Sequence, residues 1–145
     1  MRILIILAMC QMAMADDPNR MRQETVALTI LAEARGEGKM GMYLVACVIQ
    51  QRSIERKLSL DKVCREKSQF SCWNGKGVSK RLFKSTSAPY ALFLAEAMVA
   101  GRSLDRRIVA NANHYWTLET NPKWARGAKP VAVFKNHKFF RFKAK

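Results

Sequence analysis

Glu33 is the residue whose type and position best fit acid–base chemistry. On a helix it lies three positions after Ile30 and seven after Val26, so it shares a face with apolar side chains. A carboxyl group that loses water on such a face holds its proton more tightly, which suits a general acid. The periodicity alone slightly favours the alternative, an ordinary surface glutamate or a partner of Arg35.

Two further carboxylates could assist Glu33. Glu37 follows the glycine at which the first helix should stop, and Asp61 lies further along; neither is in an obviously buried setting. A glycoside hydrolase needs a second carboxylate about 5 to 9.5 Å from its acid. The sequence has none of the usual serine-nucleophile, zinc-protease, phosphate-loop or dinucleotide motifs, so a carboxylic acid acting on a glycosidic bond is the simplest enzyme it allows.

Aromatic and amide side chains in loop-like stretches are suited to a sugar-binding groove. Flat rings stack on sugar faces, while amides and imidazoles bond to hydroxyl groups. The candidates are Gln69, Phe70, Trp73, Asn113, His114, Tyr115, Trp116 and Trp124. The competing interpretation is that the rings fill the core of a small domain. For Trp73 and Trp124 the two interpretations are evenly balanced.

The beginning of the chain has the features of a secretory signal peptide. Arg2 supplies a positive charge, residues 3–9 are apolar, and Ala13 and Ala15 are the small residues that a signal peptidase reads. We expect residues 1–15 to be removed and residues 16–145 to form one secreted or periplasmic catalytic domain. No other apolar run approaches the roughly 20 residues that a membrane span needs.

The composition favours anionic partners. Lys and Arg number 26 against 11 Asp and Glu, a net charge of +15 that becomes +14 without Arg2. Such a charge suits nucleic acid, anionic membranes or cell walls, and export argues against nucleic acid. We expect a monomer that binds peptidoglycan and anionic wall polymers without a cofactor. The competing class is a secreted basic binding protein, since Lys and Phe alternate in the tail.

The cysteines predict one disulfide. Cys47 lies in an apolar run, where it behaves as a buried small hydrophobe. Cys64 and Cys72 lie eight positions apart in a polar stretch, and in an oxidising compartment we expect them to pair. A zinc site is excluded, because there is no C-x-x-C and the histidines are distant.

The hydrophobic pattern predicts a mainly helical α+β single domain with a small β element. The helix at 39–56 is apolar on nearly every side of its first half, so it should be central to the core. A long loop is expected at 75–86. The other expected helices are 17–35, 59–66 and 87–99, and the expected strands are 131–134 and 139–142.

Short motifs resemble, in order, those of the SleB-type cell wall hydrolases, which include spore cortex-lytic enzymes. They are 31–38 with Gly41 and the apolar run 45–49, then 69–73, 112–115, 122–124 and 137–140. This resemblance adds Ser71 and His137 to the candidate substrate contacts. Gln51-Arg52 departs from the usual Asn-Arg, and Lys135 stands where the family tends to have glycine.

The resemblance implies a lysozyme-like domain that cleaves peptidoglycan, with Glu33 as its catalytic glutamate. A lytic transglycosylase needs only this one carboxylate, because the C6 hydroxyl of muramic acid attacks its own anomeric carbon. We expect this reaction between N-acetylmuramic acid and N-acetylglucosamine. Lysozyme-type hydrolysis, with Glu37 as the possible second carboxylate, is the alternative.

Overall fold

The computed structural model of the chain describes residues 17–143, so the expected signal peptide lies outside the described residues. Short 3₁₀ helices occupy most connections between the main elements. The main elements are α2 (Pro18–Ala34), α3 (Gly38–Arg56), α4 (Leu60–Arg65), α5 (Ala88–Val99), β1 (His114–Thr117), β2 (Ala132–Phe134) and β3 (His137–Phe140). The predicted class, mainly helical α+β with a small sheet, is confirmed.

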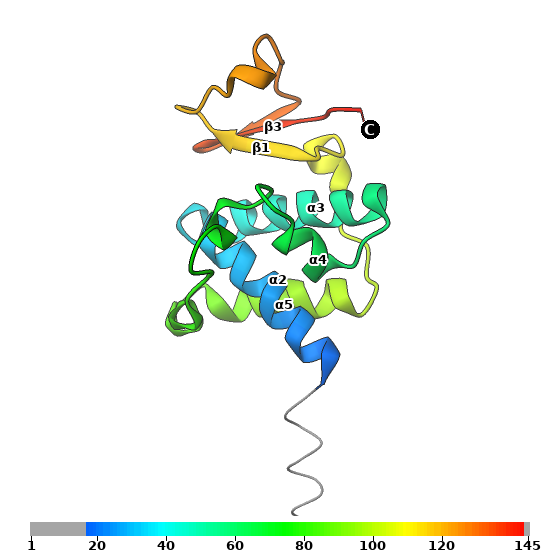
Figure 1. Cartoon of the computed structure of the whole chain (residues 1–145), viewed down its shortest axis with the longest axis vertical. Helices are drawn as coiled ribbons and strands as arrows, with labels where there is room; N and C mark the ends of the chain where they lie inside the picture. The colour runs from blue at the N-terminus through cyan, green and yellow to red at the C-terminus, as the bar shows by residue number, and fades with distance from the viewer. Residues whose placement is uncertain (1–16, 144–145) are drawn as a thin grey trace, which may run out of the picture.

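Helix α3 separates two layers of the molecule. The sheet covers one side of α3, while α2, α4 and α5 lie on its other side (Figure 1). Toward the helices it contributes Val45 and Ile49 to the main core, and toward the sheet it contributes Cys47 and Val48 to a second cluster with Phe139. This confirms the central position that its sequence predicts.

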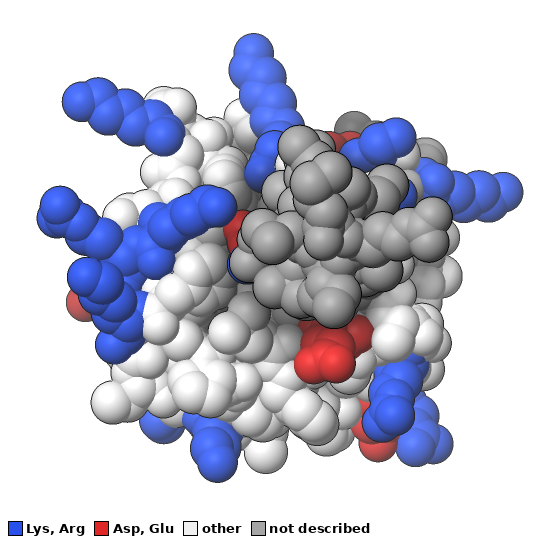
Figure 2. Space-filling model, turned by 90° about the horizontal axis from the view of Figure 1, so that it is seen from below, with Lys and Arg blue, Asp and Glu red and all other residues white. Residues whose placement is uncertain are grey.

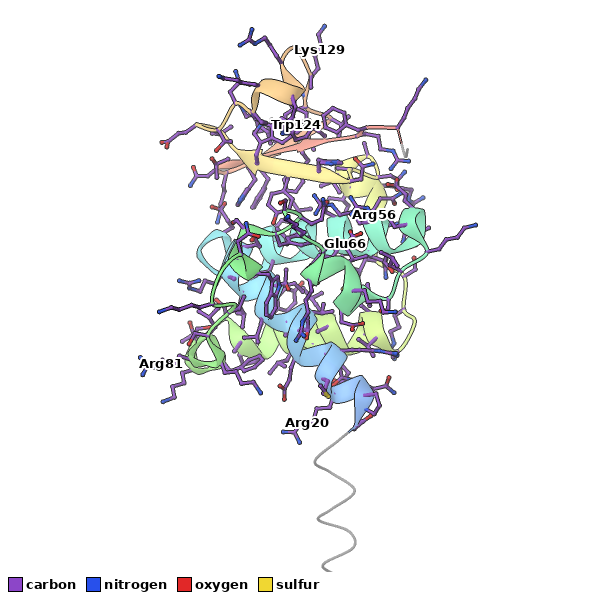
Figure 3. The ribbon with its side chains drawn as sticks, in the orientation of Figure 1. Arg20, Arg56, Glu66, Arg81, Trp124 and Lys129 are labelled. Carbon is purple, nitrogen blue, oxygen red and sulfur yellow. The ribbon has the colours of Figure 1, made fainter. Side chains whose placement is uncertain are left out.

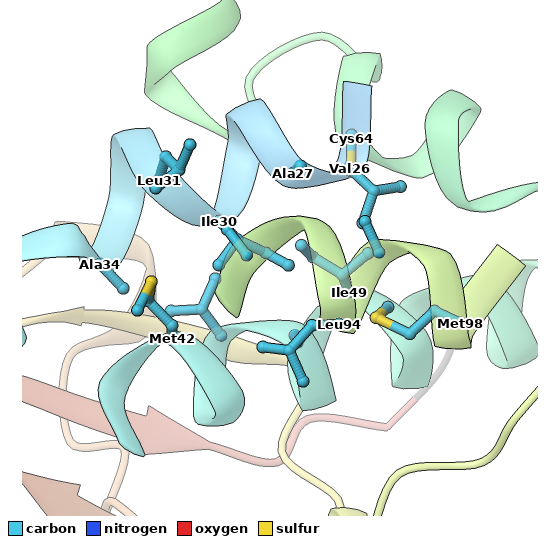
Figure 4. Packing of buried hydrophobic residues seen from close by; sticks show 14 of the residues in the cluster. Val26, Ala27, Ile30, Leu31, Ala34, Met42, Ile49, Cys64, Leu94 and Met98 are labelled. Atoms are coloured by element: carbon cyan, nitrogen blue, oxygen red, sulfur yellow. The ribbon is translucent and has the colours of Figure 1, made fainter. Parts of the chain in front are cut away.

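Helix α2 carries Glu33 to the interface between the layers. Asp17 caps its first turn by accepting a hydrogen bond from the Asn19 backbone N–H at 3.0 Å, and Pro18 occupies the first turn, where it is tolerated. Its apolar face, including Ile30 and Leu31, packs against α3 and α5 (Figure 4). The helix ends one residue before its predicted end, which places Glu33 in its last turn.

The start of α3 requires a residue without a side chain. A Cβ atom on Gly41 would lie 2.2 Å from the Cβ of Glu37 and 3.6 Å from the ring of Phe134. The glycine therefore lets the turn at residues 35–37 pack directly on the first turn of α3.

The three strands form an antiparallel sheet in the order β1-β3-β2. Tyr115 pairs with Phe139 across β1 and β3. Strand β2 was predicted, β3 lies two residues before its predicted position, and β1 was not predicted as a strand. Lys135, in the β2–β3 turn, has φ 47°, a left-handed conformation that favours glycine. The glycine that the family resemblance leads one to expect there would adopt this conformation without strain.

The predicted disulfide is absent, since Cys47, Cys64 and Cys72 are all free. Cys64 is fully buried in the main core rather than in a polar loop, and half-buried Cys72 packs against that core. Burial raises the pKa of Cys64 to about 12. Burial, followed by the neighbouring Glu33 charge, also raises the pKa of Cys72 well above its usual value. Both therefore remain protonated thiols at neutral pH.

Basic side chains are prominent on the face of the molecule seen from below (Figure 2). From below, Lys and Arg project around the edge of the visible face, whereas acidic side chains are few (Figure 2). Within residues 17–143, none of the helices has both the length and the apolar character needed to cross a bilayer.

Candidate active site

A cavity of about 670 Å³, called the first cavity, opens between the sheet and the helical layer. It brings Glu33 together with seven of the predicted substrate contacts: Gln69, Ser71, His114, Tyr115, Trp116, Trp124 and His137. The remaining lining residues are Arg52, Ser68, Asn74, Thr117, Thr120 and Pro122. Segments from α2, α3, the 68–74 loop and the sheet region therefore meet around a single carboxylate.

Glu33 is held by a hydrogen bond from the sheet. The hydroxyl group of Tyr115, on β1, donates to Glu33 Oε2 at 2.7 Å. Burial, followed by the Glu33 charge, raises the pKa of Tyr115 well above 10. Tyr115 consequently keeps its proton and remains a donor to Glu33 Oε2.

Three rings hold Tyr115 in place. Its ring centroid lies 5.3 Å from that of His137, 5.8 Å from Phe139 and 6.4 Å from Phe70. Phe70 is only 1% exposed and is absent from the lining of the first cavity. Phe70 therefore packs against Tyr115 below the site and is not placed to stack on a sugar.

Arg52 joins the two walls of the first cavity. Its side chain is buried and donates to the backbone carbonyls of Asn113 at 2.6 Å and Gln69 at 3.2 Å, while its guanidinium group lies 4.8 Å from the Phe70 ring. Desolvation lowers the pKa of Arg52 to about 10, so it remains charged at neutral pH. Sequence reasoning missed this residue, and its only signal was the Gln-Arg pair noted in the family resemblance.

Asn113 fixes the protonation of its neighbour His114. The Asn113 amide group donates to Glu55 Oε2 at 2.9 Å and to the Phe142 carbonyl at 2.8 Å. Its oxygen accepts the Phe142 backbone N–H at 3.0 Å and faces His114 Nδ1 at 2.9 Å. Because that oxygen cannot donate, His114 Nδ1 carries the hydrogen and Nε2 is the acceptor.

His114 is neutral under physiological conditions. Desolvation, together with the charges of Arg52 and Arg56, lowers the pKa of His114 to about 4. It therefore presents an acceptor nitrogen, and not a cation, to a ligand.

Besides Phe70, two predicted contacts lie outside the first cavity. Asn113 is buried, does not line the first cavity, and uses its amide to join β1 to the chain after β3. Trp73 packs against the main core, and its indole N–H donates to Thr29 Oγ1 at 2.8 Å. The structure therefore places both outside the first cavity, although their aromatic or amide character resembles that of the contacts inside it.

Neither candidate for a second carboxylate lines the first cavity. Glu37 lies in the turn before α3, where Asn136 Nδ2 donates to Glu37 Oε1 at 3.5 Å, and Asp61 is 3.7 Å from Arg22 on α2. Among the described residues that line the cavity, Glu33 is the only carboxylate. The part of the chain from residue 17 to 143 also contains no group of three or more His, Cys, Asp or Glu placed to hold a metal ion.

Comparison with known proteins gives one family. The family described as Cell Wall Hydrolase matches residues 36–140, most of the chain, in a segment that begins three residues after Glu33. The comparisons with curated proteins and with solved structures returned no match. The lysozyme-like character of the fold thus stays a prediction from the sequence.

Proposed function

Because the chain belongs to the SleB-type cell wall hydrolase family, whose substrate is peptidoglycan, we propose that it is a secreted lytic transglycosylase. It cuts the bond between N-acetylmuramic acid and N-acetylglucosamine, and Glu33 acts as both acid and base. Residues 1–15 direct export and are removed. The family is compatible with an extracellular or wall-associated location.

One observation carries this proposal: the first cavity holds Glu33, bonded to Tyr115 at 2.7 Å, as the only carboxylate among its described lining residues. A hydrolase would need a second carboxylate facing the same bond. Glu37 and Asp61 do not line that cavity. A reaction with one acid/base group fits this arrangement better.

The proton path follows from the position of Glu33. Protonated Glu33 gives its proton to the glycosidic oxygen, which leaves as the C4 hydroxyl group of N-acetylglucosamine. The C6 hydroxyl of the muramyl residue then bonds to C1 and gives its proton to Glu33. The products are a new free C4 hydroxyl end and a 1,6-anhydro ring, with Glu33 back in its acid form. Tyr115 is a positioning residue, since its hydroxyl orients the Glu33 carboxyl group.

The remaining lining is suited to a glycan. Trp124 is 67% exposed, and Trp116 lies beside it at a ring separation of 5.7 Å. These rings offer faces to sugars, while Gln69 and the acceptor nitrogen of His114 offer polar partners to hydroxyl and acetamido groups. The basic surface adds attraction for anionic wall polymers, which we propose as further partners.

Mass spectrometry of wall fragments tests the reaction. Purified peptidoglycan digested with the protein should give fragments that end in 1,6-anhydromuramic acid. Reducing muramic acid ends would instead establish lysozyme-type hydrolysis. An intact wall that retains the bound protein would establish the non-catalytic binding class.

The variant Glu33→Gln tests the acid directly. It keeps the size of the side chain and its ability to accept from Tyr115, but it has no acidic proton. We expect a folded protein that binds walls and whose rate of wall clearance is lower by about 100-fold or more. Glu37→Gln is the matched control and should retain most activity. Wild-type clearance by a folded Glu33→Gln protein would refute the assignment.

A further inference from the structure

A second cavity, of about 1120 Å³, adjoins the first one. The two share Gln69, His114 and Trp124 as lining residues, so these three side chains lie at the boundary between them. The rest of the second cavity is lined by Leu58, Phe142, Asn113 and four charged side chains, Glu55, Arg56, Glu66 and Lys143. Its chemistry differs from that of the first cavity, where sugar-binding residue types predominate.

The charged side chains of the second cavity differ in availability. Glu55 is occupied, because it accepts from Asn113 and is paired with Arg141. Arg56 and Glu66 form an ion pair whose side chains keep 29% and 31% of their surface exposed. Figure 3 shows this pair at the edge of the helical layer, on the side that faces the sheet with Trp124. Lys143 is exposed.

These groups can therefore meet a ligand that carries both signs of charge. An ion pair in contact with solvent is weak, so Arg56 and Glu66 can exchange one another for ligand groups. Lys143 adds an ammonium group, and Leu58 and Phe142 add apolar surface. A neutral sugar chain would leave these charges unused, whereas a short peptide with carboxylate, amino and methyl groups would engage them.

The glycan substrate carries such a peptide at the required place. Muramic acid bears its stem peptide on O3, on the same sugar ring whose C1 bond is cut. The stem peptide must therefore leave the first cavity close to Glu33. The second cavity adjoins the first cavity and could receive this peptide. We propose that the second cavity binds the stem peptide of the muramyl residue, an inference that rests on the proposed function.

The contacts follow from the charges. The peptide carboxylates meet Lys143 and Arg56, a free amino group on its diamino acid meets Glu66, and the alanine methyl groups lie on Leu58 and Phe142. The enzyme should consequently favour strands that keep their peptides over strands from which an amidase has removed them.

The test compares kcat/KM on two preparations of the same glycan strands, one with stem peptides and one stripped by an amidase. Lys143→Glu reverses a charge in the second cavity. Lys129→Glu makes the same change at an exposed lysine that lines neither cavity. We expect the ratio of kcat/KM on peptide-bearing to stripped strands to fall by about fivefold in Lys143→Glu and to stay at the wild-type value in Lys129→Glu.

An equal ratio in the wild type and both variants would overturn the proposed peptide site. Anhydromuramic products from the wild type would in that case leave the proposed function standing. A wild-type protein that cuts neither preparation would remove the proposed function, and the peptide site with it.

Discussion

Two side chains from distant parts of the chain are joined by a hydrogen bond in the first cavity. Glu33 lies in the last turn of α2, and Tyr115 reaches it from β1. The side chain of Tyr115 is surrounded by other rings, so its hydroxyl has a fixed direction. The carboxyl group can therefore present the same oxygen to each substrate that binds.

Tyr115→Phe should separate positioning from folding. The variant keeps the ring but loses the hydrogen bond to Glu33. A hydrogen bond to a charged group contributes about 1.5 to 3 kcal/mol, so we expect kcat to fall about 10- to 100-fold with little change in KM. Tyr43→Phe is the control, since the Tyr43 hydroxyl accepts the Asp105 backbone N–H at 2.8 Å and does not line the first cavity. Equal kcat values in the two variants would contradict a positioning role for Tyr115.

His114 should make stability depend on pH in the acidic range. Its folded-state pKa of about 4 lies below the ordinary histidine pKa of 6.5, so the unfolded chain binds more protons between these values. The stability that neutral His114 contributes to the folded protein is fully present above pH 6.5 and is lost as the pH falls toward 4. The free energy of unfolding, measured with denaturant at several pH values, should decrease less as the pH falls in His114→Phe, because phenylalanine cannot titrate. Parallel curves for the two proteins would show that His114 is not the source.

At the scale of elements, the helices were predictable and strand β1 was not. The helices beginning at Pro18 and Ala88 have proline in their first turn, and their apolar residues recur at helical spacing. Strand β1 has four residues, and its partner β3 begins about twenty residues later, so nothing local identifies it. Site residues on predicted helices, such as Glu33, could therefore be found from spacing.

The contacts that join the layers could not be found in this way. Arg52 sits on a well-predicted helix, yet its partners are backbone carbonyls at residues 69 and 113. A backbone carbonyl has no sequence signature. The prediction that Cys64 lies in a polar loop was wrong because sequence neighbours do not show which way a side chain points. Its polar neighbours face solvent, while the Cys64 side chain is buried in the core.

Gly41→Ala tests the packing of the turn on α3. The new Cβ would overlap Glu37, so we expect a loss of about 1 to 3 kcal/mol in the free energy of unfolding. Gly36→Ala is the matched control, because its Cβ would meet no atom within 4 Å and its φ is outside the left-handed region. That variant should be neutral or more stable by up to about 1 kcal/mol. Equal effects in denaturant titrations would contradict the predicted clash.

At the scale of the whole molecule, charge is the dominant property. The chain carries +15, whereas Arg52 is the only Lys or Arg among the described residues that line the first cavity. Such a field raises the local concentration of protein at an anionic wall without fixing its orientation.

Salt should therefore affect large and small substrates differently. Activity on whole walls should fall as the salt concentration rises from about 0.05 to 0.5 M, because the Debye length shrinks and long-range attraction is screened. Activity on short soluble glycans should change little, since binding there depends on contacts in the first cavity. Rate measurements over the same salt series check this, and equal sensitivity on both substrates would remove the role of the surface charge.

The division of the first cavity between two layers has a consequence for how activity arises. Glu33 and Arg52 come from helices, whereas Tyr115, His137 and Trp116 come from the sheet. In a chain whose helices have formed but whose sheet has not docked, Glu33 lacks the hydrogen bond from Tyr115. The sheet side of the first cavity, which the glycan would contact, is also missing. The proposed activity therefore requires the step that joins the two layers, so the rate at which wall clearance returns during refolding measures that step.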